Sequence, residues 1–159
     1  DLARSLDDAS PIVDVDLNAL LSTACDEAAD AGQPVRYDGP STDLVVRARP
    51  QALARSVENL IGNAVKYGAE ARVSAARDGA NAVIRVRDRG PGIPEADLER
   101  VFEPFVRLEQ SRSRETGGTG LGLYIVRNLM RRQHGDATLV NLAGADAPGL
   151  EARLTIPLA

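Results

Sequence analysis

Residues 50–67 restrict the possible folds of this chain more than any other segment. Their apolar residues recur three or four positions apart, the spacing that places side chains on one face of an α-helix. Pro50 suits a first helical turn, and Gly68 suits a helix stop. A helix with such an apolar stripe must bury it against another layer of structure. The stripe consists of Leu53, Val57, Leu60, Ile61, Ala64 and Val65.

The rest of the chain alternates between helical and extended patterns without regular βαβ units. We expect one helix from Asp16 or Asn18 to about Ala31, another from near Gly120 to near Gly135, and a short one over 95–101. The pattern predicts an α/β (α+β) sandwich, in which about three helices pack on one face of one mixed, mostly antiparallel sheet. The expected strands span residues 12–15, 35–37, 44–47, 73–76, 82–87, 137–141 and 151–157, with a hairpin turn at 78–81.

Length and composition exclude several classes of function. The chain has 159 residues, the size of one domain, and no apolar run approaches the roughly 20 residues of a membrane helix. A net charge of −4 and an aromatic content of 3% argue against a broad nucleic-acid-binding surface. The single cysteine, Cys25, lies in an apolar helical stripe and is expected in the core. We therefore expect a soluble, cytoplasmic chain that contacts neither nucleic acid nor membrane and binds phosphate only locally.

The helix over residues 50–67 also carries an unusual polar face. Asn59, Asn63, Lys66 and Tyr67 stand at positions i, i+4, i+7 and i+8, which stacks two carboxamides and an ammonium group on one side. A carboxamide oxygen can bind Mg²⁺ as a neutral hard ligand while phosphate oxygens and waters complete the coordination. Lys66 would then neutralise phosphate charge. Taken alone, the same pattern also fits an ordinary solvated face.

A second candidate segment, Asp88-Arg89-Gly90-Pro91-Gly92-Ile93-Pro94, directly follows an expected strand. Its two glycines let the backbone turn sharply and approach a flat ligand closely. The carboxylate of Asp88 can accept a hydrogen bond from an amino group, such as the exocyclic amine of adenine. A plain strand-to-loop turn is the alternative interpretation.

The third candidate is the glycine-rich run over residues 117–123, at the start of an expected helix. Glycines there expose backbone N–H groups at the positive end of the helix dipole, which favours anions. The run contains no GxxxxGK[ST] motif and does not complete GxGxxG. The preceding segment, with Phe102, Phe105 and several arginines, suits a mobile cover that the two phenylalanines anchor and whose arginines reach phosphate.

In this order and spacing, the segments resemble the catalytic, ATP-binding domain of bacterial sensor histidine kinases, in the superfamily shared with gyrase, a heat-shock chaperone and MutL-type ATPases. The resemblance covers about residues 12–158, and the run over residues 105–123 is similar to osmosensor-type kinases in particular. The motifs that carry it are Asn59-Leu60-Ile61-Gly62-Asn63-Ala64-Val65-Lys66-Tyr67 (N box), Asp88-Arg89-Gly90-Pro91-Gly92 (first glycine box), Phe102-Glu103-Pro104-Phe105 (F box) and Gly118-Thr119-Gly120-Leu121-Gly122-Leu123 (second glycine box).

The resemblance implies a role for each matching residue. Asn63 would hold Mg²⁺, while Asn59 and Lys66 would face the phosphates of ATP or ADP and complete the catalytic group. Asp88 would bind adenine, and residues 102–117 would form the ATP lid, its residues 108–117 the most mobile of the chain. The remaining residues expected to contact nucleotide are Tyr67, Gly90, Gly92, Ile93, Phe105, Arg107, Gly118, Thr119, Gly120, Leu121, Gly122 and Leu123.

The position four residues before Asn63 separates two branches of the superfamily. Hydrolytic members carry a glutamate there as a general base toward water, whereas this chain has Asn59, whose carboxamide cannot accept that proton. The adjacent Glu58 lies about 100° around the helix and is expected to have a structural or partner-facing role. The resemblance thus implies a domain that holds ATP until a histidine on a separate dimerisation domain attacks it, after which a response regulator receives the phosphate. His134, the single histidine, matches a helix-end position and is not expected to be the acceptor.

The alternative function is a nucleotide-dependent binding module, such as an anti-sigma-factor serine kinase, whose main output is sequestering a partner. An H box in the upstream sequence would distinguish the two. We expect residues 1–11 to be a remnant of an upstream dimerisation helix or linker and residues 12–159 to be the catalytic domain, part of the cytoplasmic portion of an inner-membrane sensor.

Overall fold

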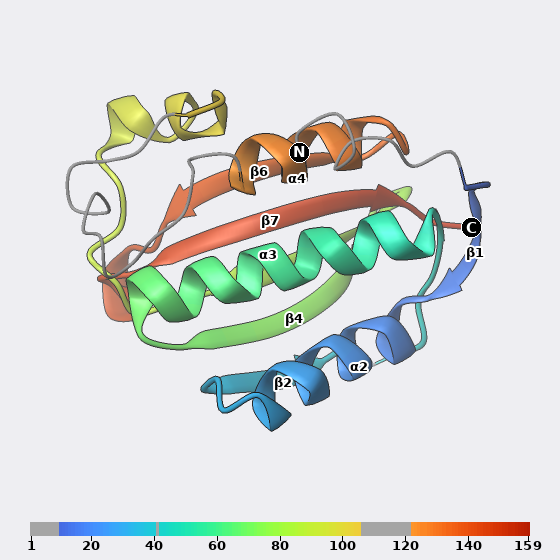
Figure 1. Cartoon of the computed structure of the whole chain (residues 1–159), viewed down its shortest axis with the longest axis horizontal. Helices are drawn as coiled ribbons and strands as arrows, with labels where there is room; N and C mark the ends of the chain where they lie inside the picture. Colours follow the sequence, from blue (N-terminus) through green and yellow to red (C-terminus); the bar gives the residue numbers. More distant parts are fainter. Residues whose placement is uncertain (1–9, 41, 106–121) are drawn as a thin grey trace.

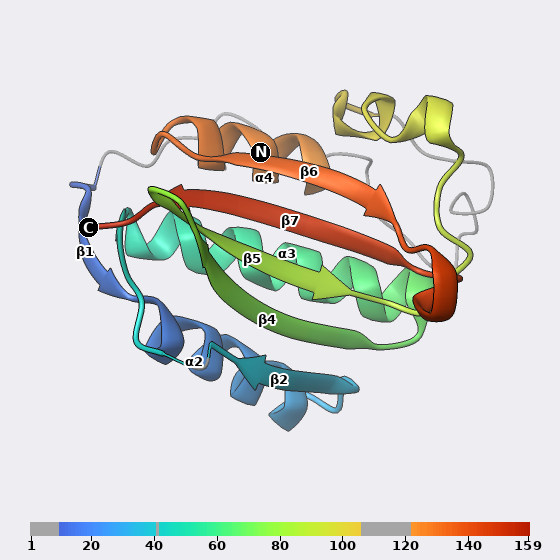
Figure 2. The same cartoon turned by 180° about the vertical axis from the view of Figure 1, so that it is seen from behind.

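A computed structural model describes residues 10–40, 42–105 and 122–159. Three helices, α2 (Leu17–Asp30), α3 (Pro50–Gly68) and α4 (Gly122–Arg131), pack on one face of a five-stranded sheet (Figure 1). Seen from behind, the opposite face of the sheet carries no helix of the described chain (Figure 2). The predicted fold class is therefore confirmed. The strands of this sheet are β2 (Val35–Gly39), β4 (Ala71–Asp78), β5 (Asn81–Arg87), β6 (Asp136–Asn141) and β7 (Leu150–Pro157).

The strand order in this sheet is β2-β4-β5-β7-β6. Only β2 and β4 run parallel, because α3 forms the crossover between them, and the other neighbours are antiparallel. The predicted hairpin joins β4 to β5, and Gly79 adopts a left-handed φ of +60° in its turn.

Two of the expected strands form a small sheet of their own, so the prediction of one sheet was incomplete. β1 (Val13–Asp16) pairs antiparallel with β3 (Val45–Ala48). An isolated β-bridge between Val46 and Leu158 links β3 to the residues that follow β7. Because α3 begins at Pro50, β3 is too short to extend along the main sheet.

α2 begins at an aspartate N-cap and buries an apolar stripe. The Oδ1 atom of Asp16 accepts a hydrogen bond from the backbone N–H of Ala19 at 3.1 Å, the expected N-cap. Cys25 is buried as predicted, and burial raises the pKa of its thiol to about 11. None of the helices in the described ranges has the length and apolarity needed to cross a membrane.

The glycines that end α3 and α4 serve close packing rather than the left-handed turn that their positions suggested. The left-handed residues are Ala69 (φ +71°) and His134 (φ +68°). Any Cβ at Gly68 would lie 2.2 Å from Cγ of Asp88, and one at Gly135 would lie 2.2 Å from the carbonyl oxygen of Thr155. The α-helical turns of α4 consequently stop at Arg131 instead of continuing to Gly135.

The predicted short helix over 95–101 is instead two 3-10 turns, Glu95–Asp97 and Arg100–Phe102. Their hydrogen bonds span three residues, as from the N–H of Asp97 to the carbonyl of Pro94 at 2.8 Å. Side-chain contacts fix this segment at both ends, at Ile93 and at Phe102, which leaves too little chain for a regular α-helix.

Candidate active site

Asn63 on α3 lies beside the first residue of α4. A methyl group at Gly122 would come within 4.0 Å of Nδ2 of Asn63. The two helices pack together along their length, with Ala52 of α3 in contact with Ile125 and Leu129 of α4. The structure therefore brings the predicted polar face of α3 next to the end of the predicted glycine run, at the N-terminus of a helix.

The polar residues of α3 are more open to solvent than its apolar stripe. Asn59 and Asn63 are half-buried, whereas Lys66 and Tyr67 are exposed. The Nζ atom of Lys66 lies 5.8 Å from the centre of the Tyr67 ring. These four side chains lie on the same side of the helix, as their spacing predicted.

Asp88 follows β5 directly and lies against Gly68, the last residue of α3, which is next in sequence to Tyr67 of the polar face. Its Oδ1 atom accepts hydrogen bonds from the backbone N–H groups of Gly90 at 2.9 Å and Leu150 at 3.0 Å. No hydrogen bond from the described residues reaches Oδ2. Burial raises the pKa of Asp88, although the two backbone hydrogen bonds oppose that shift. One oxygen of this carboxylate is thus fixed and the other is available to a ligand.

Glycines surround Asp88 where a side chain would collide with it. Gly68 touches its carboxyl group, and a Cβ at Gly149 would lie 2.4 Å from its carbonyl oxygen. A Cβ at Gly90 would lie 2.7 Å from the carbonyl oxygen of Tyr67. The first glycine box is therefore packed directly against the C-terminal end of α3, and the sequence analysis had not assigned this role to Gly68 or Gly149.

Asn141, at the end of β6, is a site residue that the sequence analysis missed. Its Oδ1 accepts the N–H of Ile93 at 2.9 Å, and its Nδ2 donates to the carbonyl of Ile93 at 2.6 Å. Nδ2 also donates to Glu95 at 3.2 Å. Gly92 has a left-handed φ of +78°, and a Cβ there would lie 2.5 Å from Oδ1 of Asn141. Asn141 therefore clamps the loop of the first glycine box, although nothing in its own local sequence indicates this.

Arg127 is a second missed residue, and it joins α4 to the segment that contains Phe102. Its guanidinium group lies 3.6 Å from the centre of the Phe102 ring and makes two hydrogen bonds to the carboxylate of Glu99. It also donates to the carbonyl of Ala137 on β6 at 2.8 Å. These hydrogen bonds from Arg127 lower the pKa of Glu99. Arg127 is only 8% exposed and Phe102 is buried, so the stacking of Arg127 on the Phe102 ring is part of the packed interior.

The prediction that both phenylalanines anchor the cover is wrong for Phe105. Phe102 is buried, but Phe105 has a left-handed φ of +66° and is 68% exposed. Of the predicted second glycine box, Gly122 begins α4 and Leu123 packs against the core. The other predicted contacts and most of the predicted lid lie outside the described residues, namely Arg107, Gly118, Thr119, Gly120, Leu121 and residues 108–117.

The donor set at Asn63 fits a magnesium ion that shares its coordination with phosphate. In the described part of the chain, no group of three or more His, Cys, Asp or Glu side chains could hold a metal by itself. Mg²⁺ often takes one or two protein oxygens and completes its shell with phosphate oxygens and water. The carboxamide oxygen of Asn63 can supply such a ligand at the N-terminus of α4.

The geometry is that of a nucleotide-binding α/β sandwich domain. The model of the family of histidine kinase-, DNA gyrase B- and HSP90-like ATPases matches residues 48–159, and the chain belongs to this family. Within it, the relatives and solved structures that the chain resembles include sensor histidine kinases and their kinase domains.

Sensor-like histidine kinase SenX3 of Mycobacterium tuberculosis is 43% identical over 131 residues, which cover 78% of this chain and 32% of SenX3. The chain spans about a third of the length of the curated relatives it matches. The crystal structure of full-length ShkA in complex with AMPPNP has a TM-score of 0.79 at 27% identity and covers 99% of this chain and 34% of that one. The histidine kinase domain of the Escherichia coli osmosensor EnvZ has a TM-score of 0.70 at 28% identity, covering 96% and 92% of the two chains.

Proposed function

We propose that this domain binds Mg-ATP and transfers the γ-phosphoryl group to a histidine on a separate dimerisation domain. The observation that carries the proposal is that Asn63 lies beside the N-terminal residue of α4, where a Cβ at Gly122 would be 4.0 Å from its Nδ2. A candidate metal ligand next to a helix N-terminus gives phosphate and metal one shared place. The likeness to ShkA, whose structure holds AMPPNP, supports ATP as the nucleotide.

Asp88 would select the base. Its fixed Oδ1 keeps the carboxylate in one orientation, and Oδ2 would accept a hydrogen bond from the amino group of adenine. Guanine has a carbonyl oxygen at the corresponding atom, which would face Oδ2 with no proton between the two acceptors. Tyr67, Gly90, Gly92 and Ile93 would enclose the nucleotide around Asp88.

The phosphates would lie along the polar face of α3. Lys66 would balance their charge, and Asn59 would donate hydrogen bonds to them. Mg²⁺, held by Asn63, would neutralise the charge that develops on the phosphoryl oxygens during transfer. Because Asn59 stands where a general base toward water would be needed, ATP would persist until the acceptor arrives.

The acceptor would come from a segment upstream of the catalytic domain, to which residues 1–11 would belong. His134 is a poor acceptor on geometric grounds. It follows the C-terminal end of α4, and the ten residues of this helix separate it from Gly122 by about 15 Å. We further propose that a response regulator receives the phosphate and that the parent protein is an inner-membrane sensor with this domain in the cytoplasm.

A labelling experiment tests the proposed function. The chain is incubated with γ-labelled ATP, Mg²⁺ and the dimerisation domain of its own full-length protein, supplied separately. We expect acid-labile, base-stable label on the dimerisation domain, loss of that label with Asn63→Ala, and no loss with His134→Gly, which suits the left-handed backbone at that position. Label on His134 of this chain, or none on the supplied domain, would overturn the proposal.

A further inference from the structure

We propose that the uncovered face of the central sheet binds an acidic protein segment. Five arginines project from this face, and we call them the arginine face. The hydroxyl of Tyr37 donates a hydrogen bond to Asn18 of α2, so Tyr37 points to the helix-covered side of the sheet. Because neighbouring strand residues point to opposite sides, Arg36 points to the side that carries no helix in Figure 2. The arginine face consists of Arg36, Arg72, Arg85, Arg87 and Arg153, with side chains between 31% and 69% exposed.

The strand register places these arginines next to one another. Arg36, Arg72 and Arg87 are direct partners across β2, β4 and β5. Arg85 and Arg153 are direct partners across β5 and β7. Like charges on directly paired strand residues destabilise a sheet. A face that only had to be soluble would therefore not be expected to contain three such arginine–arginine pairs.

Two carboxylates lie within the arginine face and balance only part of its charge. Asp38 pairs with Arg36 at 2.9 Å and with Arg72 at 3.2 Å. Glu151 pairs with Arg87 at 2.6 Å, with Arg85 at 3.7 Å and closely with Arg153. These seven strand residues carry a net charge of +3 on a chain whose total is −4, and Asp146, outside the strands, pairs with Arg87 at 3.9 Å.

Glu151 cannot satisfy the donors around it. Its side chain is 1% exposed, and although burial would raise its pKa, the hydrogen bonds from Arg87 and Arg153 lower it below the ordinary value. Three guanidinium groups offer about fifteen N–H donors, whereas a carboxylate has about four acceptor positions. In addition, the buried Nε of Arg72 finds no hydrogen-bond partner among the described residues. The arginine face therefore has donors to spare for further carboxylates.

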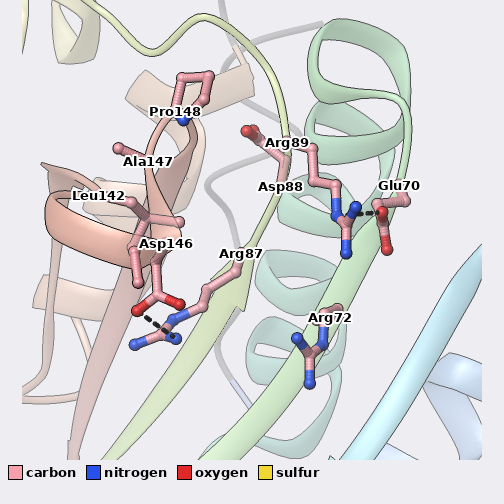
Figure 3. A pocket seen from close by; sticks show the side chains of 10 residues that line it. Glu70, Arg72, Arg87, Asp88, Arg89, Leu142, Asp146, Ala147 and Pro148 are labelled. Atoms are coloured by element: carbon pink, nitrogen blue, oxygen red, sulfur yellow. Dashed lines mark ion pairs between the residues drawn. The ribbon is translucent and has the colours of Figure 1, made fainter.

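A pocket of about 370 Å³ opens at one end of the arginine face (Figure 3). Arg72, Arg87 and Arg89 line it on one side, although Arg89 is paired with Glu70 at 2.8 Å. Asp88 also lines the pocket, and Figure 3 shows its carboxylate turned away from Arg72 and Arg87, so these two arginines lie apart from the proposed adenine contact. The opposite wall is mainly apolar and is formed by Leu142, Ala145, Ala147 and Pro148, with Asp146 between them.

The occupant that fits is an extended polypeptide segment that combines acidic side chains with interspersed apolar ones. The arginines extend across β2, β4, β5 and β7, four adjacent strands that together span roughly 14 Å. A single small anion would reach only part of this row. The apolar wall of the pocket would cover an apolar side chain of the same segment, while its carboxylates pair bidentately with the guanidinium groups.

Fluorescence anisotropy with a labelled Glu-Glu-Leu repeat peptide tests this proposal on the intact chain. Arg36→Gln combined with Arg72→Gln removes two cations whose ion-pair partner, Asp38, is near the surface, so the fold should persist. We expect this double variant to weaken peptide binding about five- to tenfold and salt to weaken it further. Arg153→Gln is a second, independent variant on another strand. The matched control combines Arg47→Gln with Arg100→Gln, two arginines that also make exposed ion pairs but lie outside the face.

Several results would overturn the proposal. One is that the Glu-Glu-Leu peptide does not bind at all, and another is that a Gln-Gln-Leu peptide binds equally well. A third is that the control variant weakens peptide binding as much as the double variant does. Competition by Mg-ATP would show that the peptide occupies the nucleotide site instead. Sedimentation that reveals a dimer broken by the double variant would assign the arginine face to a second copy of this chain. Two results together would support the acidic-segment site: a peptide affinity that is the same with and without Mg-ATP, and a loss of peptide binding in both arginine variants but not in the control. This support does not depend on whether the proposed kinase activity holds.

Discussion

Two neighbouring regions in the C-terminal half of α3 are built differently. At the Asp88 end, Asp88 is half-buried, holds two backbone hydrogen bonds and packs on Gly68 with no room for another atom. Along the polar face, Asn59 and Asn63 are equally half-buried and Lys66 is exposed, but within the described residues none of the three makes a hydrogen bond or ion pair. The Asp88 end is organised by the fold itself, whereas the polar face has polar groups that only a ligand would organise.

This difference predicts how variants will behave. Substitutions at the Asp88 end that disturb its packing should change stability and nucleotide binding together, because the same contacts serve packing and recognition. Substitutions on the polar face should change nucleotide binding alone. The predictions below test this separation, from the largest expected effect to the smallest.

Gly68→Ala should be the most damaging of these changes. The new Cβ would lie 2.2 Å from Cγ and 2.3 Å from Cβ of Asp88, and the latter atom cannot move without its backbone. We expect a loss of about 3 kcal/mol in the free energy of unfolding, at the upper end for overpacking, and ATP binding weakened at least tenfold. Chemical denaturation and calorimetry measure the two effects.

Gly62→Ala on the same helix is the matched control. A methyl group at Gly62 meets nothing within 4 Å, so alanine should raise stability by about 0.5–1 kcal/mol. If Gly68→Ala were as well tolerated as Gly62→Ala, the close packing at Asp88 would not matter for either property.

Asn63→Ala should remove the Mg²⁺ dependence of ATP binding and leave stability nearly unchanged. The side chain is half-buried and makes no hydrogen bond with the described residues, so only the ligand complex should lose by its removal. The expected loss is about 1–3 kcal/mol of binding free energy. Calorimetry with and without Mg²⁺ measures it. An equal Mg²⁺ effect in the variant and the unmodified chain would contradict the assignment of Asn63 to the metal.

Sequence patterns predicted those parts of the site that lie within one segment. The helical spacing of Asn59 and Asn63 and the position of Asp88 after a strand follow from local rules. The clamp of Asn141 on Ile93 joins residues 48 positions apart, and a single sequence carries no signal of such a contact. Local rules also gave Gly68 the right place but the wrong reason, and they placed the end of α4 too late, at Gly135, because the close packing of both glycines depends on β5 and β7.

Asp88→Asn should weaken ATP binding without weakening the fold. Asparagine Oδ1 can accept the same two backbone hydrogen bonds, but Nδ2 then replaces Oδ2, and this donor cannot accept a hydrogen bond from the amino group of adenine, which we expect to cost about 1–1.5 kcal/mol of binding free energy. Because burial raises the folded-state pKa of Asp88, the stability that its protonated form contributes is lost as the pH rises through that pKa. At neutral pH the variant should therefore be as stable as the unmodified chain or more so.

The unmodified chain provides two further measurements of Asp88. ATP affinity should fall on acidification, and at a higher pH than for an ordinary aspartate, because protonation removes the charged acceptor. GTP should bind about a hundredfold more weakly than ATP if the pocket is dry. A competition titration that gave equal affinities for the two nucleotides would make Asp88 a turn residue only.

Asn141→Ala should have the smallest effect, and it tests whether the Asp88 end acts as one packed unit. Its loss leaves the N–H and the carbonyl of Ile93 without their side-chain partner, and Gly92 gains the space that Oδ1 had filled. Because this loop is only partly buried, water can replace some of the lost bonds, so we expect a loss of about 1 kcal/mol in stability and a smaller loss in ATP binding. Asn128→Ala is the control, since its Nδ2 donates only to the carbonyl of Tyr124 within α4. A change in ATP binding with no change in stability would show that Asn141 touches the nucleotide instead of holding the loop.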